Sequence, residues 1–436
     1  MLHAPALSDA RITGWSVDSR SVQSGDLFFA LRGPNHDGNA YVEEAFRKGA
    51  VAAVANRQSS GEVLVVPDTL VALQAVASWA RDQWGGEVVG VTGSAGKTST
   101  KDIVASMLGV GMPTGKTIGN FNNHVGVPLS ILRLDSGARV AVLEMAMNHA
   151  GEIRELCKIA RPRVGVVTNV GHAHMEAFDS IEGVAAAKRE LIEALPDDGV
   201  AVLNADDRLV SKFGEAFRGR TITFGLNPGA EVRAENVELG ADGAAFSVQG
   251  VRFTSGLTGR HNVLNLLAGI AVAGLYGIRP DQLTEVARHA APGRMRGERI
   301  RHDGILILND CYNSNPDAAR AMIDALRDTP AQRRIAVLGE MLELGRWSES
   351  LHRDLGSYVA ERGIDVLVGI RGEAADLVDA ALQAGHAVNA AFFFSEPAAA
   401  GDWLRQHAQK GDVILFKGSR GTHVEQALER FLASPS

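Results

Sequence analysis

Residues 86–100 combine a β-branched run, a loop with two glycines, and a lysine followed by hydroxyl residues. This combination limits the possible folds more than any other feature of the chain. Gly93 and Gly96 lie in the loop, and apolar residues then recur at helical spacing at Ile103, Val104, Met107 and Leu108. The pattern predicts a strand, a phosphate-binding loop and a helix, in that order.

Such a loop can bind a polyphosphate because glycines let backbone N–H groups turn toward the anion and the helix N-terminus adds a favourable dipole. The usual G-x-x-x-x-G-K-[ST] pattern would place its first glycine at Val91, so an ordinary glycine turn is the alternative. A lysine and a hydroxyl residue directly after the loop favour the phosphate site. The predicted nucleotide-binding residues are Gly93, Ser94, Ala95, Gly96, Lys97, Thr98 and Ser99.

The size and composition of the chain favour a soluble protein with several domains. Its 436 residues are enough for about three domains, and 45% hydrophobic with 22% charged residues is typical of globular proteins with substantial cores. The formal net charge of −7 argues against a nucleic-acid-binding surface, although it permits a local basic pocket for an anionic substrate. We therefore expect no nucleic-acid partner.

The sequence indicates neither secretion nor membrane insertion. Cys157 and Cys311 are too few for a disulfide framework, and the first residues lack the basic and apolar regions of a signal peptide. The longest apolar stretch, residues 266–278, contains glycines and is shorter than the roughly 20 residues that cross a bilayer. We therefore expect a cytoplasmic protein with no membrane partner.

Alternating strand and helix patterns predict an α/β protein of three domains. Residues 1–83 are predicted to form a small N-terminal α/β domain without its own phosphate loop. Residues 84–297 are predicted to form a central P-loop ATPase-like parallel sheet, with an antiparallel addition at about 221–257. A polar linker at 292–297 leads to a C-terminal Rossmann-like domain at 298–436.

Ligands of such sheets bind at the carboxyl ends of strands, so the polar residues there are candidates for function. Glu144 ends one predicted central strand, and His174 follows the next. Both could reach a magnesium ion beside the phosphate loop, whereas a helix cap is the alternative for either one alone. Lys188 lies on a helix otherwise lined with apolar residues, and its spacing alone favours a solvated side chain.

A second polar group is expected where the central and C-terminal domains meet. It consists of amides, a carboxylate and aromatic side chains, among them His261, Asn262, Asn265, Asp310, Tyr312 and Asn315. Amides can read an adenine edge, and a carboxylate can bind ribose hydroxyls. Asn315 precedes Pro316, so helix capping explains that residue equally well, and we expect only part of the group to contact a ligand.

Six stretches, in order along the chain, resemble motifs of the ATP-dependent Mur ligases. They are TGSAGKTS (92–99), GNFNNHVGVPL (119–129), NHAGEI (148–153), DCYNSNP (310–316), LGEMLELG (338–345) and KGSR (417–420). The resemblance covers essentially the whole chain and is far more specific than a phosphate loop alone.

This resemblance implies a three-domain ligase that binds a UDP-sugar, ATP and an incoming amine. The chain is most similar to the branch of the family whose substrates are UDP-N-acetylmuramoyl-tripeptide and D-alanyl-D-alanine. A substrate carboxylate would attack the γ-phosphate of ATP, and the amine would then attack the acyl phosphate. ATP and Mg²⁺ are the implied cofactors, and we expect a monomer.

The resemblance also assigns roles to single residues. It implies phosphate and Mg²⁺ contacts at Lys97 and Thr98, magnesium ligands at Glu144 and His174, adenosine contacts at Asn262 and Asp310, and a CO₂-derived carbamate on Lys188. That last role reverses the interpretation from spacing alone, and Lys97, His174 and Lys188 become the catalytic candidates. Substrate contacts are implied for Asn122, Asn123 and Lys417, and uridine contacts for Asp18, Ser19 and Arg20, which alone would suggest a solvated turn.

Three positions depart from the family pattern, namely Ala146, Asn309 and Cys311, and they affect the backbone or the adenosine contacts rather than the phosphate site. Two related enzymes remain alternatives. The ligase that adds the third amino acid should carry an Asp-Asn-Pro-Arg motif, which this sequence lacks, and folylpolyglutamate synthase uses the same acyl-phosphate chemistry. A non-catalytic nucleotide switch is the alternative of a different class, and the complete set of lysine, hydroxyl and metal-ligand candidates argues against it.

Overall fold

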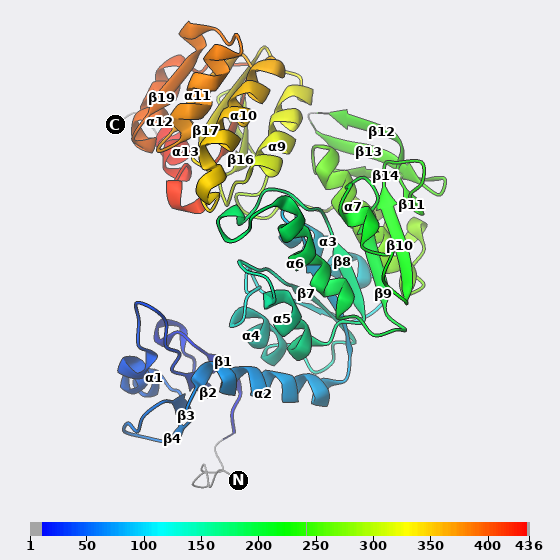
Figure 1. Cartoon of the computed structure of the whole chain (residues 1–436), viewed down its shortest axis with the longest axis vertical. Helices are drawn as coiled ribbons and strands as arrows, with labels where there is room; N and C mark the ends of the chain where they lie inside the picture. Colours follow the sequence, from blue (N-terminus) through cyan, green and yellow to red (C-terminus); the bar gives the residue numbers. More distant parts are fainter. Residues whose placement is uncertain (1–10, 241, 434–436) are drawn as a thin grey trace.

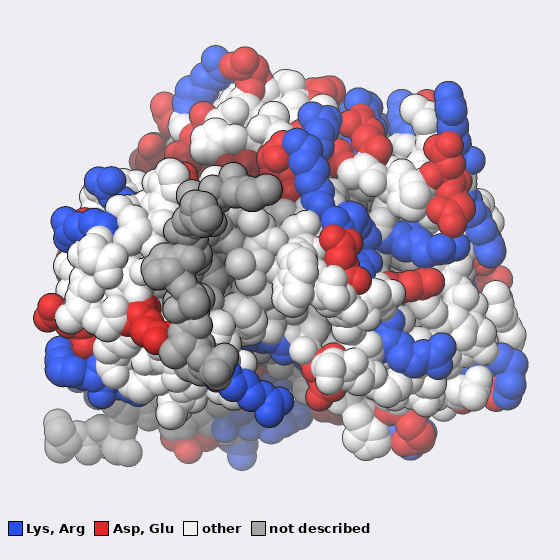
Figure 2. Space-filling model, turned by 90° about the horizontal axis from the view of Figure 1, so that it is seen from below, with Lys and Arg blue, Asp and Glu red and all other residues white. Residues whose placement is uncertain are grey.

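The computed structural model describes residues 11–240 and 242–433, which form an α/β protein, as predicted. Figure 1 shows an N-terminal part in blue, a central part in cyan to green, and a C-terminal part in yellow to red. No helix in these two ranges is long and apolar enough to cross a membrane. On the face shown in Figure 2, basic and acidic side chains are interspersed, so this face carries no continuous basic surface.

The N-terminal part is a parallel sheet in the order β1-β2-β3-β4. Its elements are β1 (Gly14–Ser16), β2 (Asp26–Phe29), α1 (Val42–Arg47), β3 (Ala52–Ala55), β4 (Val63–Val65) and α2 (Thr69–Trp84). The strand β1 was not predicted, because three residues are too few to show a periodic pattern.

Helix α2 attaches this sheet to the central part by packing against α4 (Gly126–Leu132) and α5 (Glu152–Ala160). Arg81 Nε donates a hydrogen bond of 2.8 Å to Ala160 O, and Trp84 Nε1 donates one of 2.8 Å to Ala138 O. Asp68 caps the start of α2, and Gly85 ends it in the left-handed backbone region.

The central part is a parallel sheet in the order β11-β10-β9-β8-β5-β7-β6. Its strands are β5 (Glu87–Thr92), β6 (Thr114–Lys116), β7 (Val140–Glu144), β8 (Val164–Val167), β9 (Val200–Asn204), β10 (Arg220–Gly225) and β11 (Val232–Arg233). Helices α3 (Lys97–Leu108) and α7 (Arg260–Leu275) cover one face, and α4, α5 and α6 (Ile181–Glu193) cover the other. Because both faces are covered, the inner strands are continuous apolar runs.

The predicted antiparallel addition at 221–257 is only partly correct. Strands β10 and β11 pair in parallel and extend the central sheet, because Ile222 and Phe224 of β10 pack into the same core as α7. The antiparallel part is confined to β12 (Glu235–Gly240), β13 (Gly243–Val248) and β14 (Val251–Ser255). The short helix α8 (Thr284–Arg288) packs against β14.

The C-terminal part is a sheet in the order β15-β16-β20-β17-β18-β19. It contains β15 (Glu298–His302), β16 (Ile305–Asp310), α9 (Pro316–Asp328), β17 (Arg333–Gly339), α10 (Ser348–Glu361), β18 (Val366–Ile370), α11 (Ala374–Gln383), β19 (Ala391–Phe394), α12 (Pro397–His407), β20 (Asp412–Lys417) and α13 (Glu425–Leu432). All pairs are parallel except that of β15 with β16. The edge strand β15 was not predicted, because most of its residues are charged.

The strand order of the central sheet positions the phosphate loop. This loop joins β5 to α3, and β5 lies between β7 and β8. Since parallel strands end at the same edge of the sheet, the residues that follow β7 and β8 flank the loop on its two sides.

Candidate active site

A cleft of about 530 Å³ lies between the central and C-terminal parts, where β5, β7, β8, β16 and β20 end. Its lining includes Lys97, Thr98, Glu144, His174 and Asn262 from the central part, and Asp310, Glu343 and Lys417 from the C-terminal part. Residues predicted from separate motifs are therefore brought into one cleft.

The segment that follows β8 holds the phosphate loop in place. Ala95 N–H donates to Asn169 Oδ1 at 2.8 Å, and Ser94 Oγ donates to Gly171 O at 2.9 Å. Thr168 Oγ1 donates to Ala95 O at 2.6 Å. Since these bonds order the loop before any anion binds, less conformational entropy is lost on binding.

Lys97 begins α3 and folds back over its own loop, where Nζ donates a hydrogen bond of 2.8 Å to Gly93 O. Burial lowers the pKa of Lys97, while the Glu144 and Glu343 carboxylates oppose that shift. A γ-phosphate in the cleft would stabilise the charged ammonium in the same way as these carboxylates.

Glu144 presents one carboxylate oxygen without a partner. The residue ends β7 and is 2% exposed, and its Oε1 accepts a hydrogen bond of 2.7 Å from Asn122 Nδ2. Its Oε2 is buried and has no hydrogen-bond partner within residues 11–240 and 242–433. A buried unpaired carboxylate oxygen is costly, and a hard divalent cation would satisfy it.

The side chains near Glu144 fit a magnesium ion whose ligands come partly from the protein and partly from a bound nucleotide. In the described part of the chain, no three His, Cys, Asp or Glu side chains could hold a metal by themselves. A cation at Glu144 would therefore need other oxygen ligands. The Thr98 hydroxyl lines the same cleft, and phosphate oxygens would supply the rest.

His174 follows β8 and makes a contact with the C-terminal part. Its Nδ1 lies 2.8 Å from Oε2 of Glu343, and this hydrogen bond lowers the pKa of Glu343. The backbones of His174 and Glu343 lie in the left-handed region, with φ of 58° and 65°. This conformation is uncommon for non-glycine residues, and it occurs at functional sites as well as in turns.

Lys188 is buried on α6, with 1% exposure, and makes no hydrogen bond or ion pair with any described residue. The solvated side chain that spacing alone favoured is therefore wrong. Burial, together with the positive charge of Lys97, lowers the pKa of Lys188 well below its ordinary value. Lys188 is not among the described residues that line the cleft.

Asn262 and Asp310 also line the cleft. Asn262 Nδ2 donates to Thr258 O at 2.8 Å, and Asn262 Oδ1 accepts from Asn265 at 3.2 Å. Asp310 Oδ2 lies 2.6 Å from Lys417 Nζ, a side chain that is 2% exposed. These side chains are oriented before a ligand binds.

Comparison with known families gives matches along most of the chain. Residues 11–83 match "Mur ligase family, catalytic domain", residues 91–273 match "Mur ligase middle domain", and residues 293–420 match "Mur ligase, glutamate ligase domain". The chain belongs to the Mur ligase family. These matches place the cleft between the middle domain and the glutamate ligase domain.

Similar Mur ligases are known in sequence and in structure. UDP-N-acetylmuramoyl-tripeptide–D-alanyl-D-alanine ligase of Bacillus subtilis is 34% identical, over 99% of this chain and 95% of the relative. MurF of Acinetobacter baumannii has a TM-score of 0.89 at 31% identity, over 97% of this chain and 93% of that one. MurF of Thermotoga maritima, solved in complex with ADP, has a TM-score of 0.85 at 31% identity, over 97% of each chain.

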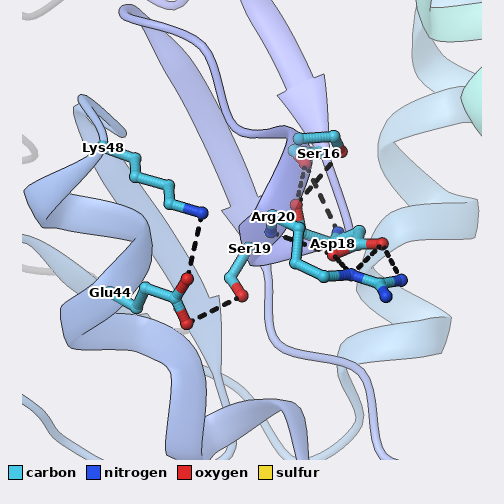
Figure 3. Close-up of polar contacts among 7 residues, drawn as sticks. Ser16, Asp18, Ser19, Arg20, Glu44 and Lys48 are labelled. Carbon is cyan, nitrogen blue, oxygen red and sulfur yellow. Dashed lines mark hydrogen bonds and ion pairs between the residues drawn. The ribbon is translucent and has the colours of Figure 1, made fainter.

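The uridine candidates of this Mur ligase lie in the N-terminal part, where they pair with neighbouring side chains (Figure 3). None of the three lines the cleft. Arg20 Nη2 pairs with Asp18 Oδ2 at 2.6 Å, and the arginine holds the pKa of Asp18 at about 2. Ser19 Oγ donates to Glu44 Oε2 at 3.2 Å. Asp18 and Arg20 are exposed enough to exchange this pairing for contacts with a ligand.

The two predicted asparagines after β6 differ in position. Asn122 lines the cleft and binds Glu144, as described above. Asn123 does not line the cleft; its Oδ1 accepts hydrogen bonds from the N–H groups of Val125 and Gly126, at the start of α4. This geometry supports a capping role for Asn123.

Sequence reasoning missed Arg296, Glu343 and the contact between Arg296 and Tyr312. The Arg296 guanidinium lies 3.8 Å from the centre of the Tyr312 ring, and both residues line the cleft. The sequence places Arg296 in a polar linker, where Arg294 and Arg296 lie between two glycines with no local signature of a site. Glu343 belongs to the quoted LGEMLELG stretch, but only the fold brings it to His174.

Gly93→Ala is expected to weaken ADP binding by about 5–150-fold, because backbone strain of about 1–3 kcal/mol corresponds to such a change. Gly93 has φ of +151°, and a Cβ there would collide with Thr168 Oγ1. Calorimetric titration with ADP measures the effect. Gly274→Ala is the matched control, since a Cβ at that helical position meets no atom within 4 Å. Equal ADP affinity in the two variants would contradict the assigned role of the loop.

Proposed function

We propose that this chain joins D-alanyl-D-alanine to UDP-N-acetylmuramoyl-tripeptide while ATP is cleaved to ADP and phosphate, a step in peptidoglycan precursor synthesis. Relatives with this name match nearly the whole chain, and a structural relative is solved with ADP. The observation that carries the proposal is the single cleft in which the phosphate loop faces strand ends of the C-terminal part.

We infer that each of the three parts of the fold binds one of the three substrates. Residues 1–83 would bind the UDP-sugar through Asp18, Ser19 and Arg20, residues 84–297 would bind ATP, and residues 298–436 would bind the amine. The exposed Asp18–Arg20 pair supports the first assignment, because hydroxyls and phosphates can replace a surface ion pair at little cost. Asn262 and Asp310 are proposed to contact adenosine, and Asn122 and Lys417 to contact substrate.

The phosphate loop and its neighbours would neutralise and orient two anions. Mg²⁺, with Thr98, Glu144 and His174 as proposed ligands, would offset the charge of the phosphates. The residue Lys97 can extend from Gly93 O toward the γ-phosphate, and the N–H groups of residues 93–99 can face the β-phosphate. With both anions fixed, a substrate carboxylate oxygen can attack the γ-phosphorus and release ADP.

The second step is an attack of the amine on the acyl phosphate. The amino group of D-alanyl-D-alanine forms the new C–N bond, and the C–O bond to phosphate breaks. The stretches at 338–345 and 417–420 end β17 and β20 and face the phosphate loop across the cleft. We propose that they bind the dipeptide.

We further propose that Lys188 carries a carbamate. A lowered pKa supports this, since the neutral amine has the lone pair that attacks the carbon of CO₂ and then loses a proton. An unpaired buried ammonium beside Lys97 is unfavourable, whereas an anionic carbamate would be attracted to Lys97 and could bind Mg²⁺. The modification would therefore remove an electrostatic conflict.

We further propose a cytoplasmic monomer, and the state of the cysteines supports the cytoplasmic location. Cys157 and Cys311 are both buried free thiols, and burial raises the pKa of Cys157 to about 12. Unpaired thiols are typical of a reducing compartment.

The choice of amine separates this function from related ligases. Phosphate release with UDP-N-acetylmuramoyl-tripeptide should be far faster with D-alanyl-D-alanine than with D-alanine, lysine, diaminopimelate or glutamate. Of these acceptors only the dipeptide has a peptide group and a second residue beyond the reacting one, and we propose that the two stretches contact these groups. Equal rates with a single amino acid would favour one of the related ligases instead.

A further inference from the structure

Residues 343–346 of the C-terminal part bind residues 174–179 of the central part through several polar contacts. His174 Nδ1 lies 2.8 Å from Glu343 Oε2, and Glu176 N–H donates to Glu343 O at 3.1 Å. Arg346 Nη2 donates to Asp179 Oδ1 at 3.1 Å. Glu343 of the C-terminal part thus contacts His174, a candidate metal ligand of the central part.

The loop that carries Glu343 is fixed by its own domain. Met341 N–H donates to Nε2 of the fully buried His352 at 2.9 Å, and His352 Nδ1 lies 2.8 Å from Ser348 O. Leu342 N–H donates to Ser419 Oγ at 2.9 Å. Glu343 is therefore presented by an ordered loop, and its position depends on how the domain docks.

The contact determines the tautomer of His174. Glu343 Oε2 lies 2.8 Å from His174 Nδ1, and a glutamate carboxylate, which is ordinarily ionised near neutral pH, can only accept a hydrogen bond. The proton must then lie on Nδ1 of His174. In a neutral imidazole this leaves the Nε2 lone pair free to bind a cation.

We propose that Glu343 is a positioning residue that fixes His174 as the Nδ1–H tautomer when the C-terminal part docks. Nε2 is then ready to bind a cation at the edge of the cleft that contains Glu144. This proposal rests on the proposed Mg²⁺ site. Docking of the C-terminal, amine-binding part would then also complete the cation site. The acyl phosphate would therefore form only when this part is docked.

A neighbouring contact between the same two parts provides a matched control. His172 N–H donates to Asp317 Oδ2 at 2.6 Å, and the His172 ring Nδ1 lies 3.1 Å from the same oxygen. Asn315 Nδ2 also donates to Ser94 O at 3.3 Å. Asp317→Ala removes a docking contact without touching His174.

The tautomer can be measured in the protein without metal or nucleotide. Long-range ¹H–¹⁵N spectra of histidine-labelled protein, at a pH where His174 is neutral, distinguish Nδ1–H from Nε2–H, and His174→Gln identifies its signals. We expect Nδ1–H in the parent protein and a shift toward Nε2–H in Glu343→Ala. Glu343→Gln should keep Nδ1–H, because the amide oxygen still accepts the bond, and Asp317→Ala should also keep it.

The second measurement is Mg²⁺ affinity in the presence of a non-hydrolysable ATP analogue, by calorimetry. Glu343→Ala should bind Mg²⁺ about 10–100-fold more weakly, as is typical when the partner of a ligating histidine is removed, whereas Glu343→Gln should retain most of the affinity. An unchanged tautomer in Glu343→Ala would overturn the proposal even if the ligation activity were established. If Glu343→Ala shifts the tautomer of His174 as expected but the parent protein does not join D-alanyl-D-alanine to the tripeptide, the proposed function is refuted and the positioning role of Glu343 stands.

Discussion

Lys97→Ala is expected to lower the rate of phosphate release by roughly a hundredfold or more, because it removes the cation that faces the γ-phosphate in the transition state. The neighbouring cations cannot replace it. Arg296 is stacked on Tyr312, and Lys417 is paired with Asp310 at 2.6 Å. The rate is measured with saturating ATP and both substrates, on protein whose thermal unfolding is unchanged.

Lys116→Ala is the matched control for this variant. Lys116 is an exposed lysine that pairs with Asp102 at 2.7 Å, and a surface pair of this kind contributes little to stability. Its turnover should match that of the parent protein. Turnover close to the parent value in folded Lys97→Ala would contradict the assignment of the phosphate loop.

The second large effect is expected for Lys188→Ala, which should be nearly inactive. The variant removes the group that we propose to carry the carbamate, and with it an anionic oxygen ligand for the cation. A short carboxylate such as acetate should restore part of the activity, because it can enter the vacated space and supply an oxygen ligand. Phosphate release at increasing acetate concentrations measures the rescue.

Lys158→Ala controls for the loss of a lysine and for the effect of acetate. Lys158 lies on α5, is exposed, and pairs with Glu155. This variant should show parent activity and no response to acetate. Full activity of Lys188→Ala without acetate would defeat the carbamate proposal. So would a well-resolved map of the active, nucleotide-bound enzyme with an unmodified Lys188.

The parts of the fold that could be predicted are those with strong local periodicity. The phosphate loop between β5 and α3, and the buried strands β7, β8, β16 and β20, follow from apolar runs and turn residues. The orientation of β10 could not be predicted, because its alternating pattern fits an antiparallel hairpin as well as a parallel edge. Its packing against α7 decides between the two, and that contact is not local in sequence.

The residues of the site could likewise be predicted only where the pattern is local in sequence. Glu144 and His174 could be predicted to flank the phosphate loop, because strand ends gather at one edge of a parallel sheet. The burial of Lys188 could not be read from spacing, since a lysine between apolar positions on a helix is usually solvated at its tip. The pairing of His174 with Glu343 joins residues of different domains and depends on how they dock.

We propose that this chain makes a peptide bond through an acyl phosphate, and oxygen transfer tests that mechanism most directly. UDP-N-acetylmuramoyl-tripeptide with ¹⁸O in its reacting carboxylate would be incubated with D-alanyl-D-alanine, ATP, Mg²⁺ and the purified protein. Since the attacking carboxylate oxygen stays on phosphorus when the amine displaces phosphate, mass spectrometry should find one ¹⁸O atom in the phosphate for each pentapeptide formed. Pentapeptide formation with unlabelled phosphate, or phosphate release without pentapeptide, would contradict the account.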